Sequence, residues 1–377
     1  MSLGTKINDS LQGDRVIWGI LALLSLFSLL AVYSASGSMA FKLRGGNTEY
    51  YLMKHMFFVC VGLGLTYFCY KRKYTSFAKV ADVIYWLSIP VLLYTIFWGA
   101  EINDARRWIS VPVIGMTFQP SDFAKLALII YIAKGISQKQ EYIKDFNSAF
   151  LPLIVPVLLT CLLIAPADLS SSVLLFTVSL LMMWVGRVDI KFIGLLVLLG
   201  LSVFAILVIV GMVFPEIVRV ETWVNRLQEF FSDSEGGFQI QQSKIAIAMG
   251  GLFGEGPGAS LQRNYLPAPY SDFIYAIICE EYGLLGGFTI LSLYVAFFYR
   301  CIVIVTKNPK AFGSMLVIGL GLLLTIQALA NIAVSVHFVP VTGLTLPMVS
   351  MGGTSVLFTS IAIGIILSVS RTHEKVT

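Results

Sequence analysis

Long apolar runs fill most of this sequence and restrict the folds that it can adopt. A membrane-spanning helix needs about 20 apolar residues, and ten stretches meet or approach that length. Charged residues make up only 12% of the chain, compared with about 25% in soluble domains. We therefore expect an all-α polytopic membrane protein whose 377 residues form a single membrane domain. The predicted spans are residues 16–36, 50–70, 79–99, 121–136, 149–165, 169–186, 190–214, 271–299, 311–335 and 346–370.

The distribution of lysine and arginine predicts the orientation. Of the 26 basic residues, 16 fall in one set of alternate loops and eight in the other, and Lys54 and Lys125 lie within spans. Cytoplasmic loops carry the excess of Lys and Arg, so both termini are predicted to be cytoplasmic. The net charge of +5 reflects this arrangement and does not indicate a nucleic-acid partner. The outer loops are then residues 37–49, 100–120, 166–168, 215–270 and 336–345.

The outer loop at residues 215–270, between the seventh and eighth spans, is by far the longest. Its first part, residues 215–234, has Trp223, Leu227 and Phe230 on one helical face, as in a helix that lies on a membrane surface. A second short helix is expected from Gln239 to Met249, before a glycine-rich stretch. Glycines permit tight turns and close approach of the backbone to a ligand. The stretch lacks the ending of a nucleotide-binding loop, so the glycines alone identify no ligand.

Asp272 follows this loop at the start of the eighth span. A carboxylate at a membrane–water boundary can act as a general base for a hydroxyl within hydrogen-bond reach; a helix cap is the alternative. Glu280 and Glu281 lie about 12–14 Å further along the same helix at 1.5 Å per residue, too far away to form a two-carboxylate pair with Asp272. Buried glutamates need partners, and Lys125 or Lys54 are the candidates.

Charged residues also surround the end of the loop at residues 100–120. Arg106 and Arg107 lie where an anionic lipid headgroup would sit, and arginine binds phosphate in a bidentate manner. Interfacial anchoring beside Trp108 is the alternative. Asp122 and Lys125 are three residues apart at a helix start and share a face. They form either a structural salt bridge or part of a polar site.

Two more segments combine helix breaks with polar residues. Asp168 precedes three serines at the start of the sixth span, which is the pattern of an N-cap and also presents a helix N-terminus to phosphate. Residues 337–357 contain Pro340, Gly343 and Pro347 within an apolar segment. Such breaks occur where non-helical backbone lines a cavity, and a proline kink is the alternative.

Common catalytic and metal-binding motifs do not occur in this sequence. It has no Ser-His-Asp order, HExxH motif or Cys/His cluster, and its five cysteines have no paired spacing. The residues alone therefore indicate a polar, anion-binding outer cavity with one well-placed acid, Asp272. Such a cavity fits an enzyme that acts on a lipid-linked substrate, or a transporter.

Four ordered motifs show which family the sequence resembles. They are ARRWI with QPSDFAKL, FQIQQSKIAIAMGGLFGEGPG, LPAPYSDFIYAIICEEYGLLG and GLTLPMVSMGGTS, spread over residues 15–371. Together they are similar to the SEDS family (shape, elongation, division and sporulation), and GLTLP and EEYG favour its division-type members over its elongation-type members. The resemblance implies a SEDS-type fold of ten transmembrane helices.

The resemblance also implies an activity, namely a peptidoglycan glycosyltransferase that polymerises lipid II at the outer face of the bacterial cytoplasmic membrane, at the division septum. Asp272 matches the family's essential acid and would accept the proton of the acceptor's 4-hydroxyl as this oxygen attacks the lipid-linked donor with inversion. Undecaprenyl pyrophosphate leaves, and its developing charge requires cations. Arg107 is the first candidate for this role, and Lys125, beside Asp122, is the second.

The resemblance further implies cavity residues and partners. Gln239, Gln242 and Ser355 match family positions and are expected to shape the cavity. The binding of a divalent cation, Mg²⁺ or Mn²⁺, to the pyrophosphate stays an open alternative, although the sequence has no cluster of metal ligands. The expected partners are a class B penicillin-binding transpeptidase, other membrane proteins of the division machinery and membrane lipids.

The chain departs from the family pattern at two positions. Asp122 stands where the motif carries a glutamate, which shortens its reach toward Lys125 by one methylene. Met351 replaces the usual tyrosine, so a hydroxyl at this position is not essential here.

Two other classes of function stay open. A lipid II flippase also has intramembrane charges and broken helices, and a scaffold that recruits the transpeptidase would use the long outer loop as a docking surface. The position of Asp272 at the outer start of a helix favours the polymerase over a transport site at the bilayer midplane.

Overall fold

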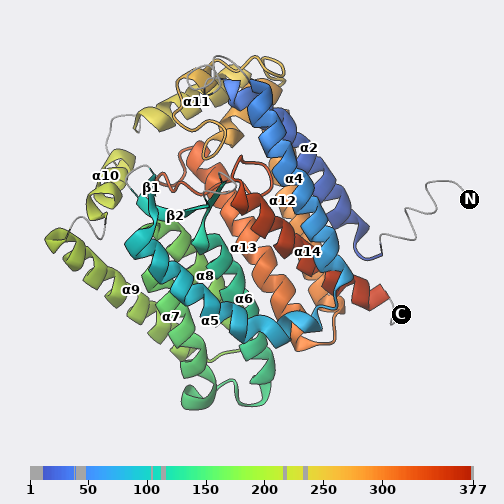
Figure 1. Cartoon of the computed structure of the whole chain (residues 1–377), viewed down its shortest axis with the longest axis vertical. Helices are drawn as coiled ribbons and strands as arrows, with labels where there is room; N and C mark the ends of the chain where they lie inside the picture. Colours follow the sequence, from blue (N-terminus) through green and yellow to red (C-terminus); the bar gives the residue numbers. More distant parts are fainter. Residues whose placement is uncertain are drawn as a thin grey trace, which may run out of the picture.

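The computed structural model describes residues 12–37, 39, 48–102, 105–111, 116–214, 219–231 and 237–374. Most of these residues lie in helices that pack side by side in one bundle (Figure 1). The bundle helices are α2 (Arg15–Ala35), α4 (Thr48–Lys71), α5 (Thr75–Trp98), α6 (Pro120–Gln138), α7 (Leu151–Ile164), α8 (Leu169–Val185), α9 (Ile190–Val213), α12 (Ile274–Lys307), α13 (Ala311–Ser335) and α14 (Thr354–Glu374).

Shorter elements connect the bundle helices. The helices α10 (Val220–Phe231) and α11 (Phe238–Gly250) lie in the long outer loop and confirm the two short helices predicted there. The remaining elements are the 3₁₀ helices η1 (Gln140–Tyr142) and η3 (Gln262–Asn264), the π-helix η2 (Phe146–Phe150) and the strands β1 (Ala100–Ile102), β2 (Ala105–Val111) and β3 (Met116–Phe118).

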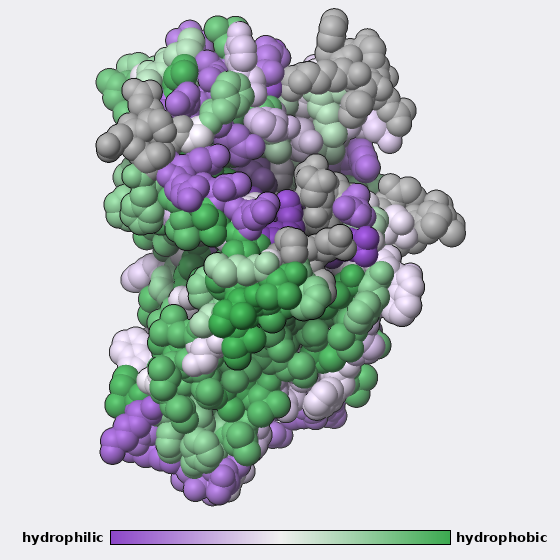
Figure 2. All heavy atoms as spheres, turned by 90° about the vertical axis from the view of Figure 1, so that its left-hand side faces the viewer, coloured by the Kyte–Doolittle hydropathy of each residue, from purple (hydrophilic) through white to green (hydrophobic). Residues whose placement is uncertain are grey.

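The predicted polytopic helical fold is confirmed. In the described part of the chain, eight helices are long and apolar enough to cross a membrane. The helix α8 is apolar but has 17 residues, and α6 carries Asp122, Lys125 and Lys134. Figure 2 shows a broad apolar band between hydrophilic ends of the molecule. Each predicted span overlaps a helix, while the count of ten spans and the cytoplasmic placement of the termini stay predictions. Residues 1–11 and most of the first outer loop lie outside the described residues.

A small antiparallel sheet, which the sequence pattern did not predict, forms in the loop between α5 and α6. Its strand order is β1-β2-β3, and Arg106 of β2 pairs with Glu101 of β1. Side chains alternate between the two faces of a strand, so the sheet sends Arg106 and Arg107 in opposite directions. Arg106 lies exposed beside Glu101, 3.6 Å away, whereas the Arg107 side chain is half-buried.

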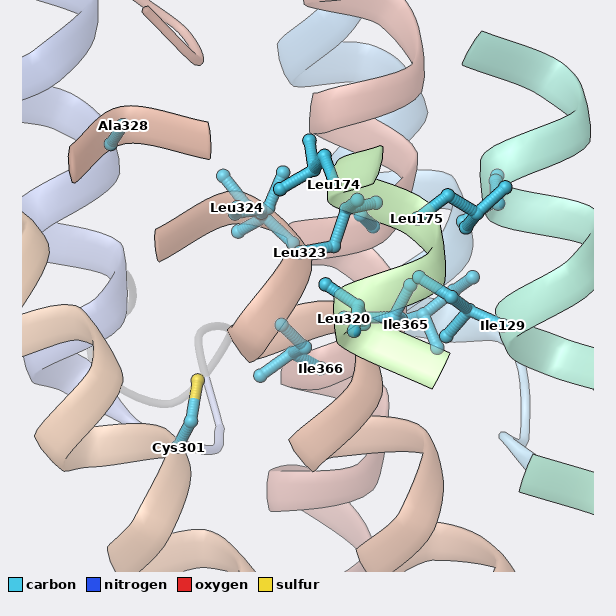
Figure 3. Packing of buried hydrophobic residues seen from close by; sticks show 14 of the residues in the cluster. Ile129, Leu174, Leu175, Cys301, Leu320, Leu323, Leu324, Ala328, Ile365 and Ile366 are labelled. Carbon is cyan, nitrogen blue, oxygen red and sulfur yellow. The ribbon is translucent and has the colours of Figure 1, made fainter. Parts of the chain in front are cut away.

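The helix α13 forms the centre of the core. Eighteen of its 25 residues are buried, compared with three of the 24 residues of α9. Figure 3 shows Leu320, Leu323 and Leu324 of α13 close to side chains of α8 and α14. Groups that α13 holds are therefore attached to a largely buried helix of the bundle.

The glycine-rich stretch after α11 lies against the first turns of α12. Leu284 N donates to the Gly251 carbonyl at 2.9 Å, and Gly256 N donates to the Glu281 carbonyl at 3.0 Å. A Cβ at Gly254 would lie 2.2 Å from the Glu281 carbonyl oxygen, so only glycine permits this approach. Gly283, at a φ of 68°, kinks α12 at this contact.

This contact also supplies the partners of the two buried glutamates. Glu280 accepts hydrogen bonds from the Ser260 hydroxyl and from Leu261 N at 2.9 Å, and Glu281 accepts one from the Ser34 hydroxyl. The expectation that Lys125 or Lys54 pairs with them is therefore wrong. Amide and hydroxyl donors of the adjacent loop and of α2 satisfy the carboxylates instead.

The last predicted span, residues 346–370, is only partly helical, because α14 begins at Thr354. The preceding residues, 340–353, form a non-helical strap that includes Met348 at a φ of 64°. Side chains of neighbouring helices bind the backbone of this strap. Gln327 donates to the Thr345 carbonyl at 2.9 Å, and the Tyr294 hydroxyl donates to the Pro347 carbonyl. The predicted break in the final apolar segment is confirmed.

The helices α4 and α14 cross in close contact at small residues. A Cβ at Gly62 would lie 2.5 Å from the Ser360 hydroxyl, and Thr66 Oγ1 donates to the Ser360 carbonyl at 2.9 Å. Small residues allow helix backbones to approach closely in membrane proteins. This crossing holds the first turns of α14, which directly follow the strap in the sequence.

We predict that Gly364→Leu destabilises the protein. A Cβ at Gly364 would lie 2.6 Å from the Thr66 carbonyl oxygen, and overpacking costs about 1–3 kcal/mol. Thermal unfolding in detergent should show a lower Tm. Gly64→Leu, on α4, is the matched control, because no described atom lies within 4 Å of a Cβ there. Equal Tm values for the two variants would contradict a tight α4–α14 contact.

Candidate active site

A cavity of about 860 Å³, in which several charged side chains interrupt a largely apolar lining, opens between α8, α10, the start of α12 and the strap. We call it the outer cavity. Residues of α10 form part of its wall. Its charged lining residues are Arg107, Asp168, Arg219, Arg226 and Asp272.

Asp272 lies in the turn that precedes α12. Its Oδ1 accepts a hydrogen bond from the Ser271 hydroxyl at 2.9 Å. Burial raises the pKa of the Asp272 carboxyl, while the Ser271 hydroxyl, Arg107 and Arg226 act in the opposite direction. A Cβ at Gly343, whose φ is 72°, would lie 3.8 Å from Asp272 Oδ2. The carboxylate thus has one fixed neighbour and otherwise faces the outer cavity.

Arg107 enters the cavity from β2. Its Nη1 lies 4.0 Å from Asp168 Oδ2. Its buried Nε has no hydrogen-bond partner within the described residues, and a buried donor without a partner is costly. The side chain still lines the cavity with 28% of its surface exposed, and its pair with Asp168 is long, so the rest of the guanidinium can bind an anion there. Of the two adjacent arginines, the structure brings Arg107 to Asp272 and directs Arg106 away.

Asp168 is the N-cap of α8, as predicted. Its Oδ1 accepts from Ser171 N at 3.0 Å, and its Oδ2 accepts from the Ser171 hydroxyl at 2.8 Å. The same carboxylate lies beside Arg107 in the cavity. Capping and a role in the cavity are therefore combined in one residue.

Two cavity arginines, Arg219 and Arg226, were not among the predicted site residues. Arg226 Nη1 donates to the Val341 carbonyl at 3.2 Å and so joins α10 to the strap. Burial lowers the pKa of Arg226, and Asp168 and Asp272 oppose this effect. A spacing of seven residues on an amphipathic helix, with Trp223 between them, places both arginines on one face. That spacing was the signal available in the sequence.

The helix α10 covers one side of the cavity. Trp223 stacks on Phe204 of α9 with ring centroids 5.9 Å apart, and Phe230 contacts the His337 ring edge-on at 5.2 Å. Trp223 and Leu227 line the outer cavity. The Trp223 face of α10 is thus directed at the protein, and the placement of this helix on a membrane surface stays a prediction.

Of the two glutamines predicted to shape the cavity, only Gln239 lines it. Both lie on α11, and Gln242 is half-buried there. A three-residue offset keeps both side chains on one face of α11, but Gln242 lies nearly one turn further along the helix and is not part of the cavity lining.

Asp122, Lys125 and Ser355 form a separate polar cluster. Lys125 Nζ lies 2.7 Å from Asp122 Oδ1, and both residues are at least nine-tenths buried. They line a void of about 20 Å³ together with Ser355, and not the outer cavity. The structural salt bridge is confirmed, so the aspartate at position 122 does reach Lys125. The expectation that Lys125 shares a cavity with Asp272 is wrong, because Asp122 holds the ammonium group of Lys125 in this separate void.

Comparisons with known proteins show the family of this chain. A family model described as cell cycle protein, covering FtsW, RodA and SpoVE, matches residues 14–375. Stage V sporulation protein E of Bacillus subtilis is 35% identical over 364 residues, which cover 95% of this chain and 97% of that protein. The probable peptidoglycan glycosyltransferase FtsW of Haemophilus influenzae is 32% identical, over 96% of this chain and 91% of that protein. FtsW of Geobacter sulfurreducens is 31% identical over 98% of both chains.

Solved structures show the same fold. The rod shape determining protein RodA of Thermus thermophilus has a TM-score of 0.68 at 21% identity, over 96% of this chain and 97% of that chain. A chain from a peptidoglycan synthase complex that coordinates polymerization and crosslinking has a TM-score of 0.68 at 22% identity, over 96% of this chain and 98% of that chain. The predicted SEDS resemblance is confirmed, and this chain belongs to the FtsW, RodA and SpoVE family of cell cycle proteins.

Proposed function

We propose that this chain is a peptidoglycan glycosyltransferase that polymerises lipid II into glycan strands at the outer face of the cytoplasmic membrane. The observation that carries the proposal is the placement of Asp272, a carboxylate with a raised pKa in a cavity that also contains three guanidinium groups. The relatives named as FtsW glycosyltransferases support it. A flippase would not require an acid among the cations of this cavity.

The chemistry follows from what each group can accept or donate. Asp272 takes the proton of the acceptor sugar's 4-hydroxyl while this oxygen forms a bond to the anomeric carbon of the donor. The bond between that carbon and the diphosphate oxygen breaks on the opposite face, which inverts the anomeric configuration. The bonding electrons leave with undecaprenyl pyrophosphate. A base with a raised pKa suits this step, because proton transfer is most effective when the pKa lies near the working pH.

The cavity arginines are suited to bind the leaving diphosphate. Arginine binds phosphate oxygens through two parallel hydrogen bonds, and fixed cations stabilise charge that develops in the transition state. Arg107 stays the first candidate because it lines the cavity and lowers the pKa of Asp272. Arg226 and Arg219 replace Lys125 as the second choice, because they line the cavity and Lys125 does not.

The cofactor, the partners and the cellular process complete the proposal. A divalent cation would be held mainly by the diphosphate. Within the described residues, no group of three His, Cys, Asp or Glu side chains is placed to hold a metal ion. A class B penicillin-binding transpeptidase is the proposed partner, which the similarity to a chain of a synthase complex supports. Septal division is the proposed process, with sporulation or elongation as the other outcomes of a localisation experiment.

We predict that Asp272→Asn abolishes glycan synthesis. General base catalysis contributes about 10²–10⁴-fold, so purified protein with its transpeptidase and lipid II in detergent should lose at least about 100-fold in initial rate. Because burial disfavours the ionised carboxylate, the amide should not lower the Tm. Glycan chains from both proteins would contradict the role of Asp272. Movement of lipid II across liposomes without polymerisation by either protein would instead support the flippase.

The pH dependence of the reaction should report the raised pKa of Asp272. The base works only when it is deprotonated, so the rate should fall as the pH drops through the pKa of Asp272. Burial raises that pKa, which places the acid limb of the profile above the usual range of an aspartate, near 3.9. The measurement is the initial rate of polymerisation against pH. An acid limb at or below pH 4 would contradict a buried base.

Removal of a cavity arginine should lower the rate and shift the acid limb of the pH–rate profile. Arg107→Gln should lower kcat/KM by about 10- to 100-fold, since a charge-assisted hydrogen bond contributes about 1.5–3 kcal/mol. Arg107 also lowers the pKa of Asp272, so its loss should move the acid limb to higher pH. Arg106→Gln is the matched control, because this exposed neighbour pairs with Glu101. If both variants behave alike, Arg107 has no special role.

A further inference from the structure

Three successive carbonyl groups around Asp272 are each held by one hydrogen bond. The Tyr270 carbonyl accepts from Met351 N at 2.9 Å. The Ser271 carbonyl accepts from the Ser350 hydroxyl at 2.6 Å. The Asp272 carbonyl accepts from Asn331 Nδ2 at 2.8 Å. We call these three contacts the carbonyl clamp. The donors come from the strap and from α13, far from residues 270–272 in the sequence.

Asn331 connects this turn to the core of the bundle. Its side chain is buried, with 1% of its surface exposed. Its Nδ2 donates to both the Asp272 carbonyl and the Leu344 carbonyl, the latter at 2.7 Å. One amide group therefore joins the turn of Asp272 to the strap. Because α13 is largely buried, this amide fixes the position of the turn relative to the core of the bundle.

Ser350 is held in place within the strap. Its hydroxyl accepts from Leu346 N at 2.8 Å while it donates to the Ser271 carbonyl. Ser350 N also donates to the Leu346 carbonyl at 2.9 Å. A hydroxyl that both accepts and donates has a fixed direction. The strap thus presents one oriented hydroxyl and one backbone N–H to the turn.

We propose that Asn331 and Ser350 are positioning residues that fix the direction of the Asp272 carboxylate in the outer cavity. This inference rests on the proposed function, in which Asp272 is the base. Rotation of the Tyr270–Asp272 backbone would move the carboxylate away from the acceptor hydroxyl. A misplacement of about 1 Å lowers the rate by up to about 100-fold. The clamp restrains this rotation without contact between its donors and the carboxylate oxygens.

A matched control lies one helical turn away on α13. Gln327 donates its side-chain amide to the Thr345 carbonyl of the same strap at 2.9 Å. Among its described hydrogen bonds, none reaches residues 270–272. Gln327→Leu and Asn331→Leu therefore remove equivalent amides from the same strap, and only the second removes a donor to the Asp272 carbonyl.

The test compares steady-state polymerisation of lipid II by four full-length variants beside the wild type, each with the transpeptidase. Asn331→Leu should lower kcat by about 10- to 100-fold with little change in KM, and Ser350→Ala should act in the same direction. Ser350→Thr keeps the hydroxyl and should retain most of the rate. Gln327→Leu should lower the Tm to a similar extent as Asn331→Leu and stay within about threefold of the wild-type kcat.

The pH profile gives a readout that a purely structural role would not change. A loosened turn admits water to Asp272, and burial is the main cause of its raised pKa. The acid limb of Asn331→Leu and Ser350→Ala should therefore move to lower pH, while that of Gln327→Leu should not. An unchanged kcat and acid limb in both variants would overturn the positioning role. Asp272→Asn, assayed beside these four variants, separates the failures: an active Asp272→Asn enzyme would overturn the role of Asp272 as the base, whereas a wild-type protein that makes no glycan would overturn the proposed function itself.

Discussion

Non-helical backbone inside a helical membrane bundle must obtain its hydrogen bonds from the protein around it, and the strap at residues 340–353 is such a segment. The side chains that satisfy it come from α13, through Gln327 and Asn331, and from α12, through Tyr294. The same strap supplies two of the three donors that hold the turn of Asp272. The broken segment is therefore what ties the candidate base to the core, and replacement of the strap by regular helix would remove that attachment.

The charges of the outer cavity explain how an acid can be buried there and still act. Three guanidinium groups face two carboxylates, those of Asp168 and Asp272. Asp168 is already engaged by the N-terminus of α8 and lies near Arg107, which leaves an excess of positive charge around Asp272. Burial raises the pKa of Asp272, and the arginines limit that rise. An incoming diphosphate would neutralise these cations and allow the pKa to rise further, which makes Asp272 a stronger base when the donor is bound.

Much of this arrangement could be predicted from the sequence, because hydropathy and capping are local signals. The apolar runs located every bundle helix, and Asp168 was recognised as a cap from the three serines that follow it. Pairings across the fold were not predictable in this way. Glu280 and Glu281 find donors on a glycine-rich loop and on α2 rather than on a lysine, and Lys125 is held by Asp122 away from the outer cavity. The short sheet that separates Arg106 from Arg107 has only three-residue edge strands, too short to leave a clear alternation in the sequence. Charge in a sequence shows that a polar site exists, but the partner of each charge depends on tertiary contacts.

The two departures from the family motif can be explained by the same contacts. Asp122 is one methylene shorter than the usual glutamate, yet its Oδ1 reaches Lys125 at 2.7 Å, because a spacing of three residues brings both side chains to one face of α6. Met351 lacks the hydroxyl of the usual tyrosine, but the carbonyl clamp uses its backbone N–H, which donates to the Tyr270 carbonyl. Any residue other than proline can supply that donor. The adjacent Ser350 has no such freedom, since the clamp uses its side-chain hydroxyl. The motif can therefore vary at position 351 without a change in how the turn of Asp272 is held, whereas position 350 must keep a hydroxyl side chain.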